Sequence, residues 1–323
     1  MARAGQNRLV NSDRAAFGYT LVVIGALLFV VNAGVSRVVM RSGIDPTALT
    51  TVRITGAAIV FGLWAAATRP QLLKPPRGWA LWNIAMLGLI GVASLQLSYN
   101  IAIDRLPVGI ALLLEYLAPV MVIVWVRFVR REPVRQRMWV AVACAVVGIG
   151  VVSRLWDGLA FDTLGVLMGL VAAVSFATYF LLGERNVADF DPLHVIFWAF
   201  LTAALLMNVV WPPWGQSGWF ETTSMLGSLE HLSLPVWLLV VWVAVLGTGA
   251  PFFCHLFALR FIPPTVVTIV AMLEPVGANI LGWAWFGETL TAVQLLGVAL
   301  VLTGIALAQT ARVRRPPEVP PST

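Results

Sequence analysis

Three ionisable side chains lie inside apolar stretches of this 323-residue chain: Arg53, Glu115 and Glu274. A charge at the centre of a bilayer costs at least about 2.5–3.5 kcal/mol unless it is paired or hydrated. Such residues are expected to bind the charged ends of a zwitterion, to exchange protons, or to pair with one another. At about 1.5 Å rise per residue, Arg53 and Glu115 lie at similar depths. A structural salt bridge between these two and a binding site are therefore both open interpretations.

Each of the two glutamates has a proline close behind it, which is expected to bend the helix. Pro119 lacks the N–H that would bond the carbonyl of Glu115, four residues earlier. Pro275 likewise frees the carbonyl of Ala271, which lies one turn from Glu274. Broken helices that line a cavity commonly build binding sites in membrane carriers, and a simple packing kink is the alternative.

Other polar residues in apolar stretches complete the predicted substrate-binding set: Gln96, Tyr99, Asn100, Asn32 and Tyr179. Hydrogen bonding between helices explains any one of them equally well. The three histidines are far apart in the sequence and show no metal-ligand spacing. Because no nucleophile elbow, phosphate-binding loop or zinc motif is present, we expect no catalytic residue, no metal site and no cofactor.

The composition indicates that these residues are positioned by membrane-spanning helices. Apolar residues make up 59% of the chain and charged residues only 11%, whereas soluble proteins carry roughly 25% charged residues. Without water the backbone must satisfy its own hydrogen bonds, so apolar runs that do not alternate with polar residues are expected to be helices. Ten runs have about the length that crosses a bilayer: 17–37, 46–68, 79–101, 107–127, 137–153, 164–183, 193–213, 235–257, 264–286 and 291–310.

The positive charges predict the orientation of these ten spans. With the N-terminus in the cytoplasm, 16 of the 21 Lys and Arg residues fall on the inside, four fall outside and Arg53 lies within a span. This asymmetry follows the positive-inside rule and requires an even number of spans. We therefore expect a multi-pass protein of the cell (inner or plasma) membrane with both termini cytoplasmic.

An internal repeat divides the chain. The segments 99–149 and 255–305 align without gaps at an offset of 156 residues. The matches that carry most weight are Pro107 with Pro263, Pro119 with Pro275, Glu132 with Glu288, and Gly148 with Gly304. Earlier in each half, Asp45-Pro46 pairs with Asp191-Pro192 at an offset of 146.

The repeat predicts the fold class, an all-α membrane protein of ten transmembrane helices in two inverted five-helix repeats. Because five spans per repeat is odd, the halves insert in opposite orientations, with the binding site between them near the midplane. The predicted units are residues 1–155 and 156–311, followed by a disordered cytoplasmic tail at 312–323. The Pro-rich composition of the tail is typical of disorder.

Two further features lie between the spans. Glu288 is predicted to be a loop residue rather than part of a site, and Thr291 with Gln294 reads as a capping box that starts the last helix. The longest loop, 214–234, has no Lys or Arg and is rich in tryptophan around Trp214. It is interpreted as an aromatic belt at the headgroups or, alternatively, as a lid over the site.

Two stretches resemble the EamA family of the drug/metabolite transporter superfamily. They are LPVGIALLLEYLAPVMVIVW at 106–125 and MLEPVGANILGWAWFGETLTAVQLLGVALVLTG at 272–304. Within that family the Arg of TVRITGAA, the ALLLEYLAP run and the MLEP run are similar to the threonine/homoserine exporter branch. The loop RREPVRQ at 130–136 departs from the pattern, since it lacks the usual Gly before Glu132.

The resemblance implies an inner-membrane secondary transporter that works by alternating access, usually as a proton-driven exporter. Its predicted partners are a small polar, amino acid-like metabolite, protons and the lipid bilayer, and no nucleic acid; a homodimer stays open. A multidrug or other metabolite carrier of the same fold is the main alternative. A passive channel and a membrane-embedded enzyme are the remaining ones, and the enzyme would need paired titratable or metal-binding groups that the sequence does not show.

Overall fold

The computed structural model describes residues 2–129, 131, 136–152, 162–258, 261, 270–271 and 273–310 of the chain. The predicted tail at 312–323 and the loop residue Glu132 lie outside this part. So does most of the first half of the predicted span 264–286.

The described part is built almost entirely of helices, as the sequence predicts. The α-helices are α1 (Ala2–Arg41), α2 (Pro46–Thr68), α3 (Trp79–Met86), α4 (Leu95–Arg105), α5 (Val108–Glu115), α6 (Ala118–Phe128), α7 (Gln136–Val152), α8 (Thr163–Asp189), α9 (Pro192–Val210), α10 (Val236–Ala244), α11 (Ala250–Ala258), α13 (Leu273–Phe286) and α14 (Ala292–Thr310). Shorter helical segments are η1 (Pro70–Leu73), η2 (Leu87–Ser94), η4 (Pro213–Gly215), η5 (Gly227–Leu229) and η6 (Val245–Gly249). Strands β1 (Thr222–Ser224) and β2 (Ser233–Pro235) pair antiparallel, with Thr222 opposite Pro235.

Six helical stretches are long and apolar enough to cross a membrane: Ala16–Arg41, Pro46–Thr68, Trp79–Arg105, Thr163–Gly183, Pro192–Val210 and Val236–His255. Shorter apolar helices cover Val108–Val122, Gln136–Val152 and Ala292–Leu307. These nine stretches correspond to nine of the ten predicted runs. The chain is therefore a membrane protein with many apolar helices.

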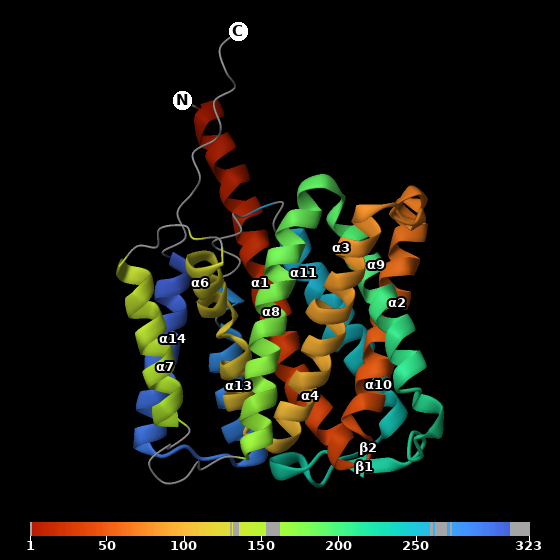
Figure 1. The fold of residues 1–323 in the computed structure, drawn as a ribbon, viewed down its shortest axis with the longest axis vertical. Helices are drawn as coiled ribbons and strands as arrows, with labels where there is room; N and C mark the ends of the chain where they lie inside the picture. The colour runs from red at the N-terminus through yellow and green to blue at the C-terminus, as the bar shows by residue number, and fades with distance from the viewer. Residues whose placement is uncertain are drawn as a thin grey trace.

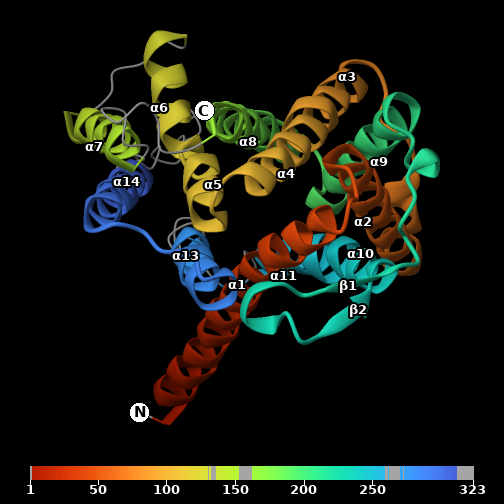
Figure 2. The same ribbon diagram turned by 90° about the horizontal axis from the view of Figure 1, so that it is seen from below.

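The helices lie side by side in one bundle, and the β1–β2 hairpin closes one end of it (Figure 1). We call this end the hairpin end; the start of α1 projects from the opposite end. Helix α7 packs against α14 on one flank, and α2 packs against α9 on the other, while α1 runs between them in contact with α11 and α13 (Figure 2).

Two π-helical segments interrupt the bundle at corresponding places. Segment η2 joins α3 to α4, and η6 joins α10 to α11. The whole of η6 falls within η2 when the chain is shifted by the repeat offset of 156 residues. π-Helical insertions are rare and are often found at functional sites. The matching positions of η2 and η6 therefore indicate where in the interior a functional site is to be sought.

Matching helices begin with the same cap but run in opposite directions. Asp45 accepts a hydrogen bond from the Thr47 N–H at 2.8 Å at the start of α2. Asp191 accepts one from the Leu193 N–H at 2.9 Å at the start of α9. Such caps satisfy an N–H that has no partner within the helix. Helix α2 leads away from the hairpin end, whereas α9 leads towards it (Figure 1).

The antiparallel contact between α7 and α14 repeats itself. A Cβ on Gly297 would lie 2.9 Å from the Gly148 carbonyl oxygen, and a Cβ on Gly304 would lie 2.7 Å from that of Ala141. Shifting the first pair by the offset of 156 residues gives the second pair. The backbones approach so closely that only glycine fits, as is usual where membrane helices pack.

An ion pair joins distant segments at the hairpin end. Arg37 of α1 pairs with Glu288, and its other terminal nitrogen donates to the Leu106 carbonyl at 2.5 Å. Glu288 also accepts from the backbone N–H of Val108, 3.1 Å away, at the start of α5. Glu288 lies in the loop predicted for it, where it ties α1, α5 and the α13–α14 loop together.

The predicted capping box is confirmed, and the long loop is folded. The Thr291 hydroxyl accepts from the Gln294 N–H at 3.3 Å, and the Gln294 side chain accepts from the Thr291 N–H at 3.0 Å. In the 214–234 loop the Met225 carbonyl accepts from the Trp285 indole at 2.8 Å. The loop is thus fastened to the end of α13, while Trp214 remains 78% exposed.

Candidate binding site

Arg53 is held inside the bundle by neutral oxygen atoms. It projects from α2 and is only 2% exposed. Its Nε donates to the Thr248 hydroxyl at 2.7 Å, and Nη1 lies 3.5 Å from the Asn100 side-chain oxygen. A guanidinium has five N–H donors in a planar fork, so these two contacts leave donors available for a further acceptor.

The local backbone explains why those oxygens face the arginine. Thr248 lies in the π-helical segment η6, and its hydroxyl donates to the Val243 carbonyl at 2.9 Å. The hydroxyl oxygen is then free to accept from Arg53. On α4, the Asn100 amide nitrogen donates to the Thr50 hydroxyl at 2.8 Å, which orients the amide oxygen towards the guanidinium.

The salt bridge that similar depths suggested between Arg53 and Glu115 is not formed. No described carboxylate lies within ion-pair distance of Arg53. Glu115 is the last residue of α5, and it lies near enough to Arg53 and Tyr99 to act on them electrostatically without contacting the guanidinium. Depth alone left out the direction of the side chains around each helix, and this is the reason for the difference.

The helix that carries Glu115 is interrupted directly after it. Helix α5 ends at Glu115, and α6 begins at Ala118 with Pro119 as its second residue. In between, Leu117 donates to the Leu114 carbonyl at 3.1 Å, a tighter turn than that of an α-helix. The interruption places Tyr116 in the interior, where it is 7% exposed.

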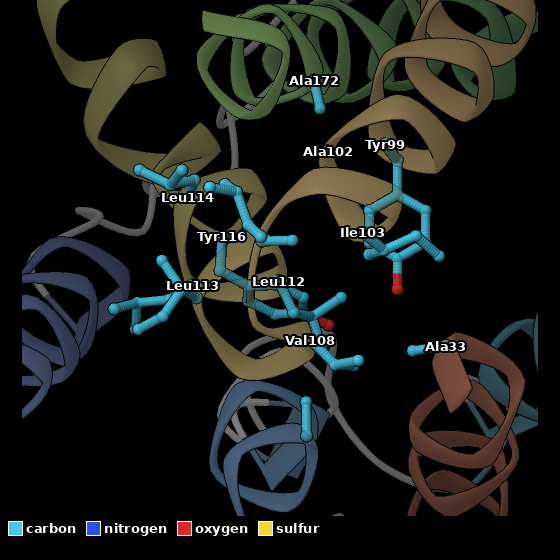
Figure 3. Packing of buried hydrophobic residues seen from close by; sticks show 14 of the residues in the cluster. Ala33, Tyr99, Ala102, Ile103, Val108, Leu112, Leu113, Leu114, Tyr116 and Ala172 are labelled. Atoms are coloured by element: carbon cyan, nitrogen blue, oxygen red, sulfur yellow. The ribbon is translucent and has the colours of Figure 1, made fainter. Parts of the chain in front are cut away.

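Tyr99 and Tyr116 approach the interior from different elements. Tyr99 projects from α4 towards the part of α1 that carries Ala33, and Tyr116 lies on the segment between α5 and α6 (Figure 3). The Tyr99 hydroxyl interacts electrostatically with Arg53, Glu115 and Glu274. Gln96 lies one turn earlier on α4 and is also buried, at 6% exposed.

Glu274 belongs to the same cluster but comes from the second half of the chain. It lies in the first turn of α13 and is 4% exposed. It is hydrogen-bonded to Tyr116 and interacts electrostatically with Glu115. Its Oε1 lies 3.8 Å from Nε2 of His255 on α11. The two glutamates and Arg53 therefore face one region of the interior from three different helices.

The remaining two predicted residues, Asn32 and Tyr179, each lie against a π-helical segment. Asn32 of α1 is pressed against Gly247 of η6, where a Cβ would collide with its side chain. Tyr179 of α8 lies against Gly91 of η2, where a Cβ would be 3.0 Å away. Each residue thus fills the equivalent place next to a π-helical glycine. Tyr179 also packs edge-on to Phe252, with ring centroids 6.3 Å apart.

Three residues of the cluster were missed or undervalued by sequence reasoning. Thr248 stands between two glycines in an apolar run, and only its π-helical backbone turns it to Arg53. Tyr116 follows Glu115 directly and could have been suspected from the Pro119 break. His255 lies in an apolar run, and nothing in the sequence places it opposite Glu274.

An apolar pocket lies apart from this cluster. It has a volume of about 380 Å³ and is lined by Val60, Phe61, Trp64, Val245, Gly249, Ala250 and Phe253. This lining has no charged side chain, so the pocket suits an apolar ligand and not a zwitterion.

The cluster has the chemistry of a recognition site. One buried cation with free donors, one buried and one part-buried carboxylate, and tyrosine and amide groups suit a small molecule that carries both charges. Within the described part of the chain, no three His, Cys, Asp or Glu residues are grouped closely enough to hold a metal ion.

Comparison with known proteins finds several transporters that are similar to this chain. The chain is 28% identical over 297 residues to an uncharacterized transporter of Archaeoglobus fulgidus, covering 90% of this chain and 96% of the relative. It is 26% identical over 227 residues to the threonine/homoserine exporter RhtA of Escherichia coli K12, covering 70% of each chain. It is 24% identical to the uncharacterized transporter YwfM of Bacillus subtilis, with 91% and 94% covered.

A solved crystal structure shares the fold, with a TM-score of 0.56 and 21% identity over 92% of this chain and 96% of that one. The model of the EamA-like transporter family matches twice, at residues 16–154 and 163–310. The family and these relatives are transporters and not enzymes. Because the two matches cover most of the sequence, the chain belongs to the EamA-like transporter family.

Proposed function

We propose that this chain is a secondary carrier of the cell membrane that exports a small polar metabolite, an amino acid or a related compound, by proton-coupled alternating access. The observation that carries the proposal is the cluster of Arg53, Glu115 and Glu274, in which the arginine has no carboxylate partner among the described residues. A buried, unpaired cation is costly unless a ligand supplies the counter-charge. The exporter RhtA among the relatives favours an amino acid.

The proposed architecture is ten transmembrane helices in two inverted five-helix repeats, residues 1–155 and 156–311, with both termini cytoplasmic. The double match of the family model supports two repeats. The shared positions of η2 and η6, the opposite directions of α2 and α9, and the self-repeating contacts between α7 and α14 support their inversion. The hairpin end then faces outward. Inverted halves of this kind expose a fixed central site to each side in turn.

In the proposed mechanism Arg53 binds the substrate carboxylate, while Glu274 or Glu115 exchanges a proton as the halves rock. The groups facing Glu274 are His255 of α11, Tyr116 between α5 and α6, and Glu115 at the end of α5. The helix interruption after Glu115 lets α5 and α6 move separately. Closure at the hairpin end is provided by the ion pair of Arg37 with Glu288, which joins α1 to the α13–α14 loop.

The test is a substrate screen in proteoliposomes with an imposed pH gradient. We expect saturable counterflow of labelled L-threonine or L-homoserine, accelerated by the gradient. The double variant Glu115→Gln/Glu274→Gln is expected to lose the acceleration. Transport by this variant at the wild-type rate would remove the carboxylates from the mechanism, and non-saturable flux would indicate a channel.

A second candidate substrate class is favoured by one observation, the apolar pocket between α2, η6 and α11. An aromatic or otherwise apolar compound would fit its lining of Phe61, Trp64 and Phe253. The same screen separates the two, because an apolar cation such as a tetraphenylphosphonium ion would then show counterflow that does not depend on Arg53.

A further inference from the structure

Two buried polar atoms face each other without a hydrogen bond. They are Nε2 of His255 and Oε1 of Glu274, which lie 3.8 Å apart. Neither atom has a hydrogen-bond partner among the described residues, and both are shielded from solvent. Buried polar atoms are nearly always hydrogen-bonded, so a facing pair without partners calls for a ligand that donates to both.

The other polar atoms of the two side chains are already engaged. The His255 ring is hydrogen-bonded to the Val22 backbone, and Glu274 is hydrogen-bonded to Tyr116. A neutral imidazole has one N–H, and the bond to the Val22 carbonyl uses it, which leaves Nε2 with a lone pair. The gap is therefore bounded by an imidazole nitrogen with a lone pair and by a carboxyl oxygen.

The distance between His255 and Glu274, and the aromatic rings near His255, indicate which kind of donor would fit. A separation of 3.8 Å is too long for a direct N–H···O bond, but a nitrogen about 2.9 Å from each atom would bond both. Phe29 stacks on the His255 ring at 5.7 Å and an interplanar angle of 21°, and Phe252 meets Phe29 edge-on at 5.5 Å. These rings lie beside His255, and aromatic rings attract organic cations.

We propose that His255 and Glu274 form the ammonium subsite for a substrate with a primary amine, which donates one N–H to Nε2 and another to Oε1. This proposal rests on the proposed carrier function and assigns one end of the substrate: the amine lies between α11 and α13, and the carboxylate lies at Arg53. His255 thereby becomes a specificity-determining residue that distinguishes amines with several N–H groups from cations without one.

His194 provides a matched control. Its Nδ1 is 2.8 Å from the Leu72 carbonyl, and its Nε2 is buried without a partner, as in His255. It stacks on Phe190 at 5.6 Å and 23°, much as His255 stacks on Phe29. No described carboxylate forms an ion pair with it. A substitution here therefore reproduces the loss of a buried histidine without touching Glu274.

The experiment is thermal unfolding of the purified full chain in the presence of methylammonium chloride. Tetramethylammonium chloride serves as the comparison, because it has the same charge but no N–H. We expect saturating methylammonium to raise the unfolding midpoint by about 2 °C or more, and tetramethylammonium to leave it unchanged. The shift should be lost in His255→Phe, which keeps a ring against Phe29, and in Glu274→Gln, and it should persist in His194→Phe.

The outcomes separate this proposal from the carrier function. Equal shifts with both salts, no shift in the wild type, or a shift that survives in both His255→Phe and Glu274→Gln would overturn the ammonium subsite, whatever transport shows. A methylammonium shift that disappears in these variants would support it, even if no amino acid is transported and the proposed function fails.

Discussion

The two arginines inside the bundle, Arg37 and Arg53, are held in opposite ways. Arg37 pairs with Glu288, donates to a backbone carbonyl and lies 5.2 Å from the centroid of the Phe286 ring. Arg53 is buried more deeply, yet its described hydrogen bonds go only to the side chains of Thr248 and Asn100. A cation with a carboxylate partner joins segments of the fold, whereas a cation without one is available to a ligand.

The largest expected effect concerns the unpaired arginine. Arg53→Gln removes the counter-charge proposed for the substrate carboxylate, and losing one partner of a buried charge pair costs about 2–5 kcal/mol. We expect the half-saturating substrate concentration for counterflow to rise on the order of 100-fold or more. The unfolding midpoint should hardly fall, since no carboxylate of the described residues would lose its cation. Unchanged transport by Arg53→Gln would show that the unpaired arginine does not differ from Arg37 by binding the substrate.

The paired arginine is expected to show the reverse pattern. Arg37→Gln leaves Glu288 partly buried without its cation, which we expect to cost about 2 kcal/mol of stability. Thermal unfolding of Arg37→Gln, Glu288→Gln and the double variant measures this cost. The double variant should recover most of the loss, because no uncompensated charge remains. Additive losses in the double variant would show that the pair is not the relevant interaction.

A smaller effect is expected at the hydroxyl that orients Arg53. Thr248→Val keeps the shape of the side chain but removes a hydrogen bond to a charged group, worth about 1.5–3 kcal/mol. We expect an increase of about tenfold in the half-saturating concentration in counterflow. Thr202→Val is the matched control, because the Thr202 hydroxyl bonds only the Trp198 carbonyl, 2.7 Å away on the same helix. Equal effects in the two variants would contradict a role for Thr248 in positioning Arg53.

The smallest effect is expected at the ion pair of Arg69 with Asp191, whose atoms lie 2.5 Å apart at the end opposite the hairpin. Arg69 is 45% exposed there, and exposed pairs are typically worth 0.2–1 kcal/mol. Arg69→Gln should therefore lower the unfolding midpoint by less than Arg37→Gln does, and high salt should erase the difference. A larger loss at Arg69 would show that exposure does not govern these pairs.

The helical class and nearly every membrane-crossing stretch could be predicted from the sequence. Length and apolarity decide whether a segment crosses a membrane, and both are local properties. The capping box of Thr291 and Gln294 could be predicted for the same reason. The helix interruption before Pro119 follows a local rule as well, because proline removes a backbone donor.

Which side chains meet could not be read in this way. Similar depth suggested an Arg53–Glu115 pair, but the π-helical turn of η6 directs Arg53 to Thr248 instead. His255 and Glu274 come together only because α11 and α13 pack on α1. Glu288 was predicted to be a loop residue, and its ion pair with Arg37 could not be foreseen, because the two residues lie 251 positions apart. Contacts between distant segments depend on helix rotation and packing, which periodicity does not encode.

The central claim is that Arg53, Glu115 and Glu274 surround the transported molecule. The most direct measurement is a cryo-electron microscopy structure of the full chain in lipid nanodiscs, with the substrate identified by counterflow at saturating concentration. The account predicts ligand density within about 3 Å of the Arg53 guanidinium and extending towards Glu274. Density confined to the apolar pocket of Val60, Trp64 and Phe253, with Arg53 still bonded only to Thr248 and Asn100, would contradict it.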